Sequence, residues 1–337
     1  IPLGATKQFI GLNYVVNPLG KYDSTNLPSL VWTGRADKVE LLEEFDEQPD
    51  VLILGSSRSM KLDPDFIEDL SGLTAFNAGV NSARAEDYYV MLRYILEHMD
   101  KKPKYILLGI DVEAFHNKTA IDDRLLYNET LAQYLHDDDK ASLADKLRTL
   151  LSYNETAATF TSLYYAATGY PKPETTYEDD GFLHYIEKEQ EIVEGDFQPE
   201  IDEYIEKYRS RFNGFTELSK DRKRYFQQFL ALAEKHNIVV FGFITTLHDD
   251  VIADLRKTRN YDEIKAELIE FLNEQQTQHD HFHYEDFDRV DQYGGSLTAF
   301  YDGAHIHEEN ANLIIEKLLK KASLLRTNEA AYLYQYK

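Results

Sequence analysis

Short apolar runs that alternate with longer amphipathic stretches restrict the fold of this chain more than any other feature. The runs are apolar at nearly every position, as buried parallel strands are. The stretches between and beside them carry apolar residues at helical spacing. The predicted strands are 51–54, 73–76, 105–110 and 238–244, and the predicted helices are 63–70, 85–99, 222–236, 261–275 and 308–319. This order predicts an α/β domain with a doubly wound, mostly parallel sheet.

One long segment interrupts the alternation. Residues 116–218 are acidic and tyrosine-rich, are mostly helical in pattern, and contain Pro171, Pro173 and a loop-like run at 174–181. Because this is too long for an ordinary connection, we interpret it as a mainly helical insertion. It is either a lid over the strand ends or a subdomain that only packs. The predicted organisation is an N-terminal extension (1–50), the first half of the α/β domain (51–115), the insertion (116–218), the second half (219–322) and a C-terminal tail (323–337).

Composition limits the chemistry and the partners. The 337 residues are 43% hydrophobic, which is enough for a substantial core. Lys and Arg number 36 against 60 Asp and Glu, a net charge of −24, so binding to nucleic acid or to an anionic bilayer would begin with repulsion. A neutral or cationic substrate is easier to accommodate. Cysteine is absent, which excludes disulfides, thiolate nucleophiles and cysteine-bound zinc.

A serine-containing turn follows the first predicted strand. Residues 51–60 are typical of a strand that runs into a Gly-Ser-Ser-Arg turn, in which Ser57 is the third residue of the segment 55–58. A serine there lies at the carboxyl edge of the sheet, where open α/β folds bind ligands. The Gly-x-Ser-x-Gly nucleophile elbow requires glycine at the position of Ser59, which disfavours an α/β-hydrolase. By itself, Gly-Ser after a strand also fits an ordinary turn.

Asp302 and His305 form the second candidate group. They belong to the sequence Tyr-Asp-Gly-Ala-His, which leads into the helix predicted at 308–319. A carboxylate three residues before a histidine can accept the Nδ1 proton and leave Nε2 free to act as a base. The alternative is that Asp302 is a helix N-cap beside a surface histidine.

The loop after the second predicted strand is the candidate oxyanion hole. It reads Phe-Asn-Ala-Gly-Val-Asn-Ser over 76–82. The backbone N–H of Gly79 can approach a substrate closely, and the amide of Asn77 or Asn81 can act as a further donor. The same residues also fit a simple Asn/Gly turn.

The order of these pieces resembles that of the SGNH (GDSL-like) hydrolase superfamily. Gly55-Ser56-Ser57 looks like its Gly-Asp-Ser first block, Gly79 like the glycine of its second block, Gly109-Ile110-Asp111 like its third block, and Asp302-Gly-Ala-His305 like its fifth. The resemblance spans the chain apart from the insertion and the terminal tails. It implies a flavodoxin-like three-layer fold, Ser57 as the nucleophile, Ser57 and Gly79 as backbone donors, and His305 as a base that Asp302 orients.

Asp111 departs from the family pattern. The third block carries an asparagine whose amide donates to the oxyanion, whereas an ionised Asp111 would oppose that charge. Either Asp111 is protonated, or Asn81 or another donor replaces it, or the site is not a standard esterase. The Gly-Ser-Ser block and this aspartate resemble divergent bacterial relatives that attach or transfer acyl groups on cell-surface polymers. These include alginate acetylation proteins and the D-alanyl transfer protein of teichoic-acid operons.

Further polar residues are candidates for contact with a substrate. Arg58 and Arg84 are expected either to recognise an anionic or acyl group or to form salt bridges with acidic neighbours. His248 follows the fourth predicted strand and either lines the site or begins the next loop. Asp111 is also a candidate for contact with the substrate. Three histidines at every second position of 279–283 would share one face of a strand and suit a metal. We expect this segment to form the last strand and its approach instead, with no metal.

The predicted function is a serine-dependent acyl hydrolase or O-acyltransferase. It would act on a cell-surface polysaccharide or a similar acylated substrate through an acyl-Ser57 intermediate, without a cofactor. The resemblance implies an extracytoplasmic location, an anchor upstream of Ile1 and a membrane-bound acyltransferase as a partner. The alternative is a non-catalytic carbohydrate-binding or assembly protein with a degenerate site. A flavodoxin-like nucleotide binder is disfavoured, because no Gly-rich phosphate loop follows a strand.

Overall fold

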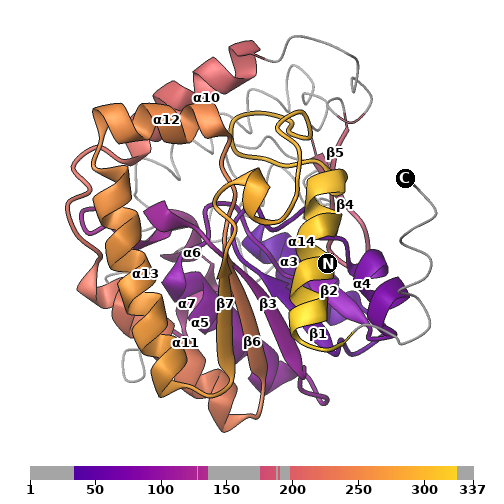
Figure 1. Cartoon of the computed structure of the whole chain (residues 1–337). Coiled ribbons are helices and arrows are strands. Elements are labelled where there is room, and N and C mark those ends of the chain that lie inside the picture. The colour runs from indigo at the N-terminus through magenta and orange to yellow at the C-terminus, as the bar shows by residue number, and fades with distance from the viewer. Residues whose placement is uncertain (1–33, 127, 136–174, 187–188, 190–197, 325–337) are drawn as a thin grey trace, which may run out of the picture.

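A five-stranded parallel sheet is the centre of the computed structural model (Figure 1). The structure describes residues 34–126, 128–135, 175–186, 189 and 198–324. The strands follow the order β2-β1-β3-β6-β7, which is that of flavodoxin-like doubly wound folds. The predicted fold class is therefore confirmed. The strands are β1 (Val51–Leu54), β2 (Ala75–Asn77), β3 (Tyr105–Ile110), β6 (Val239–Ile244) and β7 (Phe282–Asp286).

The central strands are recognisable in the sequence because both of their faces are buried. All of β1 is buried, and β3 and β6 are buried after their first residue. β1 and β3 have the predicted bounds, whereas β2 begins at Ala75 rather than 73 and β6 at Val239 rather than 238. β7 is an edge strand whose residues after Phe282 are only partly buried, and it includes the end of the 279–283 segment predicted to form the last strand.

Helices cover both faces of the sheet (Figure 1). On one face, α4 and α14 pack against side chains that include Ile53 and Leu107. On the other face, α5, α11 and α13 pack against side chains that include Leu52 and Leu108. Alternate residues of a strand point to opposite faces, so each central strand contributes to both cores. The helices are α4 (Pro64–Ser71), α5 (Ala85–His98), α11 (Lys220–Lys235), α13 (Tyr261–Gln278) and α14 (Glu308–Lys321).

Part of the predicted N-terminal extension packs into this domain. α3 (Arg35–Glu44) contributes Val39 and Leu42 to the same core as α5. The Arg35 guanidinium is buried and lies 2.7 Å from the Asp87 carboxylate of α5. Breaking a buried ion pair of this kind costs about 3–5 kcal/mol, so α3 is firmly attached to the sheet.

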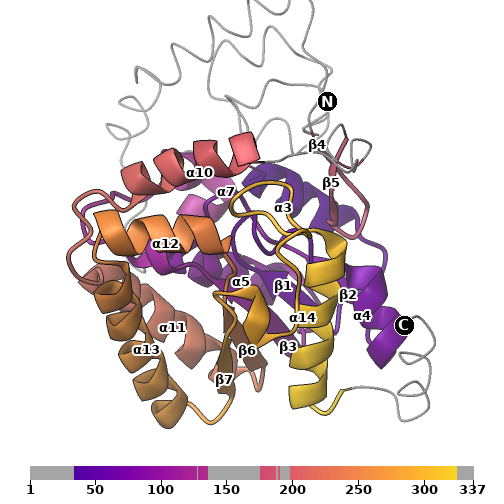
Figure 2. The same ribbon diagram turned by 45° about the horizontal axis from the view of Figure 1, so that its top comes forward.

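The described part of the predicted insertion contains helices and an unpredicted hairpin. β4 and β5 pair antiparallel, and Figures 1 and 2 show this hairpin and α10 at the end of the sheet where the parallel strands end, with α10 beside α12. Residues 136–174 of the insertion and 325–337 of the tail lie outside the described residues. The elements around this edge are η1 (Val112–Phe115), α6 (Asp123–Leu126), α7 (Glu129–Ala132), β4 (Thr175–Tyr177), β5 (Leu183–Tyr185), α10 (Gln198–Arg211) and α12 (Asp249–Thr258).

A helix that crosses a membrane must be both long and apolar. Within the described residues, no helix combines the length and the apolar character that crossing a bilayer requires.

Candidate active site

Ser57 lies in a tight turn directly after β1. Gly55 begins the turn with a positive φ of 139°, and the Ser59 N–H donates to the Ser56 carbonyl at 2.9 Å. A Cβ on Gly55 would lie 2.3 Å from Ser59 Oγ and 2.9 Å from the Gly109 carbonyl of β3. Only glycine fits this close approach, which fixes the turn against β3 and leaves Ser57 partly exposed at the carboxyl edge of the sheet.

His305 lies between Ser57 and Asp302. Ser57 Oγ is 2.9 Å from His305 Nε2, and His305 Nδ1 is 2.9 Å from each carboxylate oxygen of Asp302. With the Nδ1 proton donated to Asp302, Nε2 is free to accept the serine hydroxyl proton. Asp302 is buried, and His305 is partly exposed. The three side chains have the geometry of a Ser-His-Asp triad, in which the base activates the serine as a nucleophile.

The Asp302 carboxylate also organises the loop that carries it. Its Oδ1 accepts hydrogen bonds from the N–H groups of Ala304 and His305, each at 2.9 Å. The Tyr301 N–H donates to the His305 carbonyl at 2.8 Å, which closes the same turn. Of the two roles that the sequence allowed, Asp302 takes that of the partner of the imidazole. It also caps the turn that carries it, but it is not the helix N-cap, because His307 is at the N-cap position of α14.

His248 borders this loop through its backbone. Its N–H donates to the Gly303 carbonyl at 3.0 Å, which joins the loop to the end of β6. The imidazole Nδ1 accepts from the Asp250 N–H at 3.3 Å and so caps α12, and the ring packs edge-on against Phe300. Burial lowers the pKa of His248, which favours the neutral ring. Of the two roles that the sequence allowed, His248 takes that of the residue that begins the next element.

The predicted oxyanion donors differ in their availability. The Ser57 N–H has no acceptor among the described residues. The Gly79 N–H, by contrast, donates to Oδ1 of Asn77 at 3.0 Å. Asn77 is buried, and its amide donates to the carbonyls of Ser59 at 3.0 Å and Leu62 at 2.9 Å. Asn77 thus joins the end of β2 to the serine turn, and the Gly79 N–H is engaged inside the protein.

Asn81 and Arg84 lie further along the same loop. Asn81 is exposed. Arg84 precedes α5, where its N–H donates to Asp87 Oδ2 at 2.9 Å and its guanidinium donates to the Ala120 carbonyl. No hydrogen bond or ion pair within the described residues joins either side chain to the triad. The structure therefore does not bring these two predicted site residues to Ser57.

Asp111 and Arg58 form a buried ion pair next to the serine turn. Nη2 of Arg58 is 2.9 Å from the Asp111 carboxylate and 2.6 Å from that of Glu113, and Thr245 Oγ1 donates to Asp111 at 2.8 Å. Burial raises the pKa of Asp111, and the positive charge of Arg58 opposes that shift. Arg58 takes the salt-bridge role that the sequence left as an alternative. Asp111 therefore acts as a hydrogen-bond acceptor, whereas the pattern that the sequence resembles has a donating asparagine at the corresponding position.

Two tyrosines of the insertion flank His305. The ring centroid of Tyr185, on β5, is 5.9 Å from that of His305, and the ring of Tyr204, on α10, lies edge-on at 5.6 Å. The Tyr204 hydroxyl is 3.3 Å from His305 Nδ1. Neither tyrosine was predicted, because tyrosines recur throughout 116–218 and no motif marks these two.

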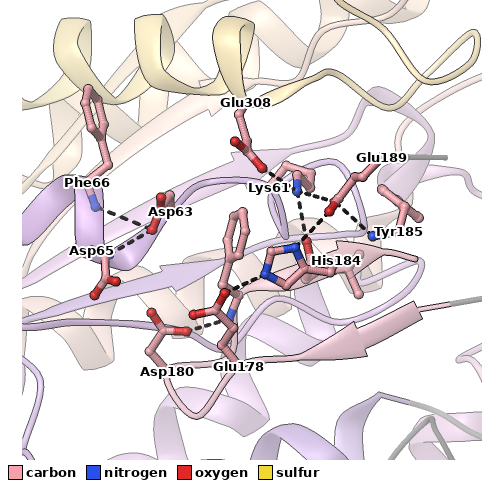
Figure 3. Close-up of polar contacts among 12 residues, drawn as sticks. Lys61, Asp63, Asp65, Phe66, Glu178, Asp180, His184, Tyr185, Glu189 and Glu308 are labelled. Carbon is pink, nitrogen blue, oxygen red and sulfur yellow. Dashed lines mark hydrogen bonds and ion pairs between the residues drawn. The ribbon is translucent and has the colours of Figure 1, made fainter. Parts of the chain in front are cut away.

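Lys61 connects the hairpin to the serine turn and to α14 (Figure 3). Its buried ammonium donates to the Leu183 carbonyl at 3.0 Å and lies 2.7 Å from Glu189 and 3.2 Å from Glu308. Glu189 also contacts His184 Nδ1 at 2.8 Å. The hydrogen bond from Lys61 to Leu183 and the ion pair of Lys61 with Glu189 therefore hold the hairpin beside the serine turn, and no local sequence pattern marks this network.

Three carboxylates meet at the turn of the hairpin. Asp65, Glu178 and Asp180 offer oxygens within 4.8 Å of one another, and the described residues contain no other group of three or more side chains placed to share a metal ion (Figure 3). Burial and the neighbouring Glu178 raise the pKa of Asp180 to about 6. The histidines of 279–283 are not part of such a group, and His279 Nδ1 lies 2.8 Å from Glu234.

Comparisons with known proteins do not identify the activity of this chain. No family model and no curated protein matches it. One solved structure that it resembles, from Bacteroides fragilis NCTC 9343, is described as a "putative acylhydrolase". The match has a TM-score of 0.38 and 11% identity and covers 86% of this chain and 95% of that chain. At such values the likeness carries no argument about activity.

Proposed function

We propose that this protein is a serine-dependent acyl hydrolase or O-acyltransferase that works through an acyl-Ser57 intermediate. The observation that carries the proposal is the continuous hydrogen-bonded chain from Ser57 Oγ through the His305 imidazole to the Asp302 carboxylate, at 2.9 Å in each step. A partly exposed serine, a base and a buried orienting carboxylate are the groups that covalent acyl transfer requires.

In the first half-reaction, Ser57 Oγ attacks the acyl carbonyl carbon while His305 Nε2 takes the hydroxyl proton. The bond from the carbonyl carbon to the leaving alcohol then breaks, and His305 gives its proton to the departing oxygen. Asp302 remains ionised and stabilises the imidazolium that forms between these steps. The products are the acyl-Ser57 ester and the free alcohol.

In the second half-reaction, a hydroxyl acceptor attacks the acyl-Ser57 ester. His305 Nε2 takes the proton of the acceptor and then gives it to Ser57 Oγ as the ester bond breaks. Water as the acceptor makes the protein a hydrolase, and a sugar hydroxyl makes it an O-acyltransferase. Both reactions use the same three residues, so the choice depends on what reaches Ser57 past α10 and the hairpin, which stand at this edge of the sheet (Figure 2).

The Ser57 N–H is the donor best suited to stabilise the oxyanion, because it belongs to the nucleophile itself and has no acceptor in the described part of the chain. The Gly79 N–H would contribute only by sharing or leaving its bond to Asn77 Oδ1. In other enzymes the loss of one oxyanion donor costs about 10²- to 10³-fold in kcat. Slow turnover of simple esters is therefore expected.

The proposed substrate is an acylated carbohydrate or cell-wall polymer outside the cytoplasm, with a membrane-bound acyltransferase as a partner. Its support is the resemblance of the Gly-Ser-Ser block and of Asp111 to the divergent envelope relatives. The net charge of −24 adds to this support, since it favours a neutral or cationic substrate over nucleic acid. Release of acetate from an acetylated polysaccharide, or its transfer between sugars, measures this part of the proposal directly.

A non-catalytic carbohydrate-binding or assembly protein is the second candidate. The observation that favours it is that groups at the positions expected to contact a substrate instead form hydrogen bonds or ion pairs within the protein. The Gly79 N–H is bound to Asn77, and Asp111 is paired with Arg58. A protein that kept the fold and lost the oxyanion hole would have this arrangement.

Labelling with a fluorophosphonate probe separates the two candidates. The wild type should be labelled at Ser57, as located by mass spectrometry, whereas Ser57→Ala should not react and His305→Ala should react far more slowly. Ser71→Ala is the matched control, because the Ser71 hydroxyl donates to the Ile67 carbonyl within α4. An unlabelled wild type that also releases no acid from acetylated polysaccharide would identify the binding protein as the better account.

A further inference from the structure

The side-chain hydroxyl of Tyr204, a residue of the insertion, lies next to the Asp302–His305 pair. The oxygen is 3.3 Å from His305 Nδ1, and the two rings meet edge-on with centroids 5.6 Å apart. Tyr185 approaches the same imidazole, with its ring centroid 5.9 Å from that of His305. Two side chains that are distant in sequence from the triad thus restrict the orientation of its base.

α10 is fixed where it can hold this hydroxyl in place. Arg209 Nε donates to the Asp254 carboxylate of α12 at 2.7 Å, and Arg259 Nε donates to the Arg209 carbonyl at 3.0 Å. α12 begins directly after His248, whose N–H donates to the Gly303 carbonyl of the triad loop. α10, α12 and the triad loop are therefore joined to one another by hydrogen bonds rather than by loose contact.

Gly303 shows how closely the loop and α10 approach. A Cβ at this position would lie 2.6 Å from the Cβ of Tyr204 and 2.8 Å from Cγ2 of Val251. Distances this short are not tolerated between carbon atoms, so the glycine between Asp302 and His305 is required for Tyr204 to reach the pair. The glycine of the Asp-Gly-Ala-His sequence therefore leaves the space that Tyr204 of the insertion occupies.

The hydroxyl is a suitable donor for the Asp302 carboxylate. Asp302 is buried, so it needs partners for both of its oxygens. Burial, the charge of Asp302 and a hydrogen bond to Asp302 raise the pKa of Tyr204, so the phenol keeps its proton and remains a donor. The contact adds a donor from α10 to those that His305 and Ala304 supply from the loop itself.

We infer that Tyr204 is a positioning residue of the triad, whose hydroxyl holds the Asp302 carboxylate and the Nδ1 side of His305 in the orientation that directs Nε2 to Ser57. The catalytic consequence rests on the proposed function, whereas the positioning of the pair does not. The insertion then takes part in the chemistry of the site and does more than cover it.

Tyr204→Phe tests the inference kinetically, because it removes the hydroxyl and keeps the ring. We expect kcat for a chromogenic acetyl ester to fall on the order of tenfold with KM little changed, since a hydrogen bond to a charged group is lost from the catalytic base and not from a substrate contact. Tyr225→Phe is the matched control, because the buried Tyr225 hydroxyl donates to the Leu135 carbonyl at 3.2 Å in another part of the fold. An unchanged kcat in Tyr204→Phe overturns the inference.

The Nδ1 proton of His305 gives a readout that needs no catalysis. Proton NMR of the wild type should show a slowly exchanging downfield resonance that is absent in His305→Ala. Tyr204→Phe should broaden or shift this resonance, and Tyr225→Phe should not. If it is the same in Tyr204→Phe and the wild type, the inference fails even for an active enzyme. If it responds while the wild type shows no acyl chemistry, the proposed function fails and the positioning role stands.

Gly303→Ala tests the same contact from the other side. The added methyl group would displace Tyr204 from the pair, so kcat should fall at least as far as in Tyr204→Phe. The double variant should lose little more than Gly303→Ala alone, because both changes break one interaction. Fully additive losses would contradict the shared role. A thermal melt shows whether each variant is folded, and if Gly303→Ala is not, Tyr204→Phe decides the question.

Discussion

The two sides of the candidate site differ in the partners of their polar groups. On the proton-transfer side, Ser57, His305 and Asp302 bond to one another at 2.9 Å. On the oxyanion side, the groups expected to face a substrate bond to the protein instead, since the Gly79 N–H donates to Asn77 and Asp111 is paired with Arg58. The first side has the geometry that would activate a nucleophile. On the second side the Gly79 N–H and Asp111 are bonded internally, and the Ser57 N–H has no acceptor within the described residues.

This difference separates two properties that usually go together in esterases. Reactivity of the serine depends on the base and its orienting carboxylate, whereas turnover also depends on donors aimed at the developing oxyanion. We therefore expect Ser57 to react readily with a fluorophosphonate probe while simple esters turn over slowly. Variants on each side of the site test this difference.

Loss of the nucleophile should have the largest effect. Ser57→Ala removes only a hydroxyl from a partly exposed position, so the fold should survive while ester turnover falls on the order of 10⁴- to 10⁶-fold. His305→Ala should fall about as far, because the two groups act as a unit. The measurement is hydrolysis of a chromogenic acetyl ester. If Ser57→Ala retains its activity and Ser56→Ala does not, the nucleophile is one residue earlier than proposed.

Asp302→Asn should have a smaller effect on the same side of the site. The Asn Oδ1 can still accept the N–H groups of Ala304 and His305, but its NH₂ group would face Nδ1 and favour the wrong tautomer. We expect turnover to fall on the order of 10³- to 10⁴-fold. Asp291→Asn is the control, since Asp291 is exposed and pairs with the nearby Arg289 at 3.2 Å, away from the triad. A tenfold loss or less would show that Asp302 is mainly a turn cap.

Asp111→Asn tests the oxyanion side, because it introduces the asparagine found in the SGNH pattern that the sequence resembles. The side chain faces Arg58 and Thr245, so we expect no gain in ester turnover and a loss of about 1–3 kcal/mol of unfolding free energy from the broken pair, with Glu113 still beside Arg58. Urea unfolding measures the second effect. Glu285→Gln, which breaks a more exposed pair with Lys321, should cost less than about 1 kcal/mol. A clear rise in turnover of Asp111→Asn would show that the amide introduced by this substitution reaches the oxyanion.

The hairpin beside the proton-transfer side supplies the smallest expected effect. Burial opposes protonation of His184, but hydrogen bonds to Glu178 and Glu189 raise its pKa above the ordinary value of 6.5. Because the folded-state pKa is raised, the protonated imidazole of His184 stabilises the folded protein. This stabilisation is fully present below pH 6.5 and is lost as the pH rises through the folded-state pKa. The urea midpoint of the wild type should therefore exceed that of His184→Gln most at about pH 6 and least at about pH 8.5. If the difference between the two urea midpoints does not change with pH, the contacts of His184 with Glu178 and Glu189 are not ion pairs.

The sheet was predictable because its signal is local. Burial of both faces makes β1 and β3 continuous apolar runs, and their predicted bounds agree with the structure. α3 and the β4–β5 hairpin were not predicted. The buried face of α3 includes the charged Arg35 and Lys38, which find partners only in other elements and so give no amphipathic pattern in the sequence.

Local sequence patterns predicted the parallel strands, the helices that cover the sheet and the candidate residues Ser57, Asp302 and His305, because each of these signals comes from residues adjacent in the chain. The donors and charges that remain available to a substrate depend on contacts between distant parts of the chain. The bond from Gly79 to Asn77 depends on the path of the loop after β2, the pair of Arg58 with Asp111 joins the ends of two strands, and Tyr204 comes from α10. Hydrogen bonds and ion pairs form over a few ångströms in space, and spacing along the chain does not reveal them when the partners lie on different elements.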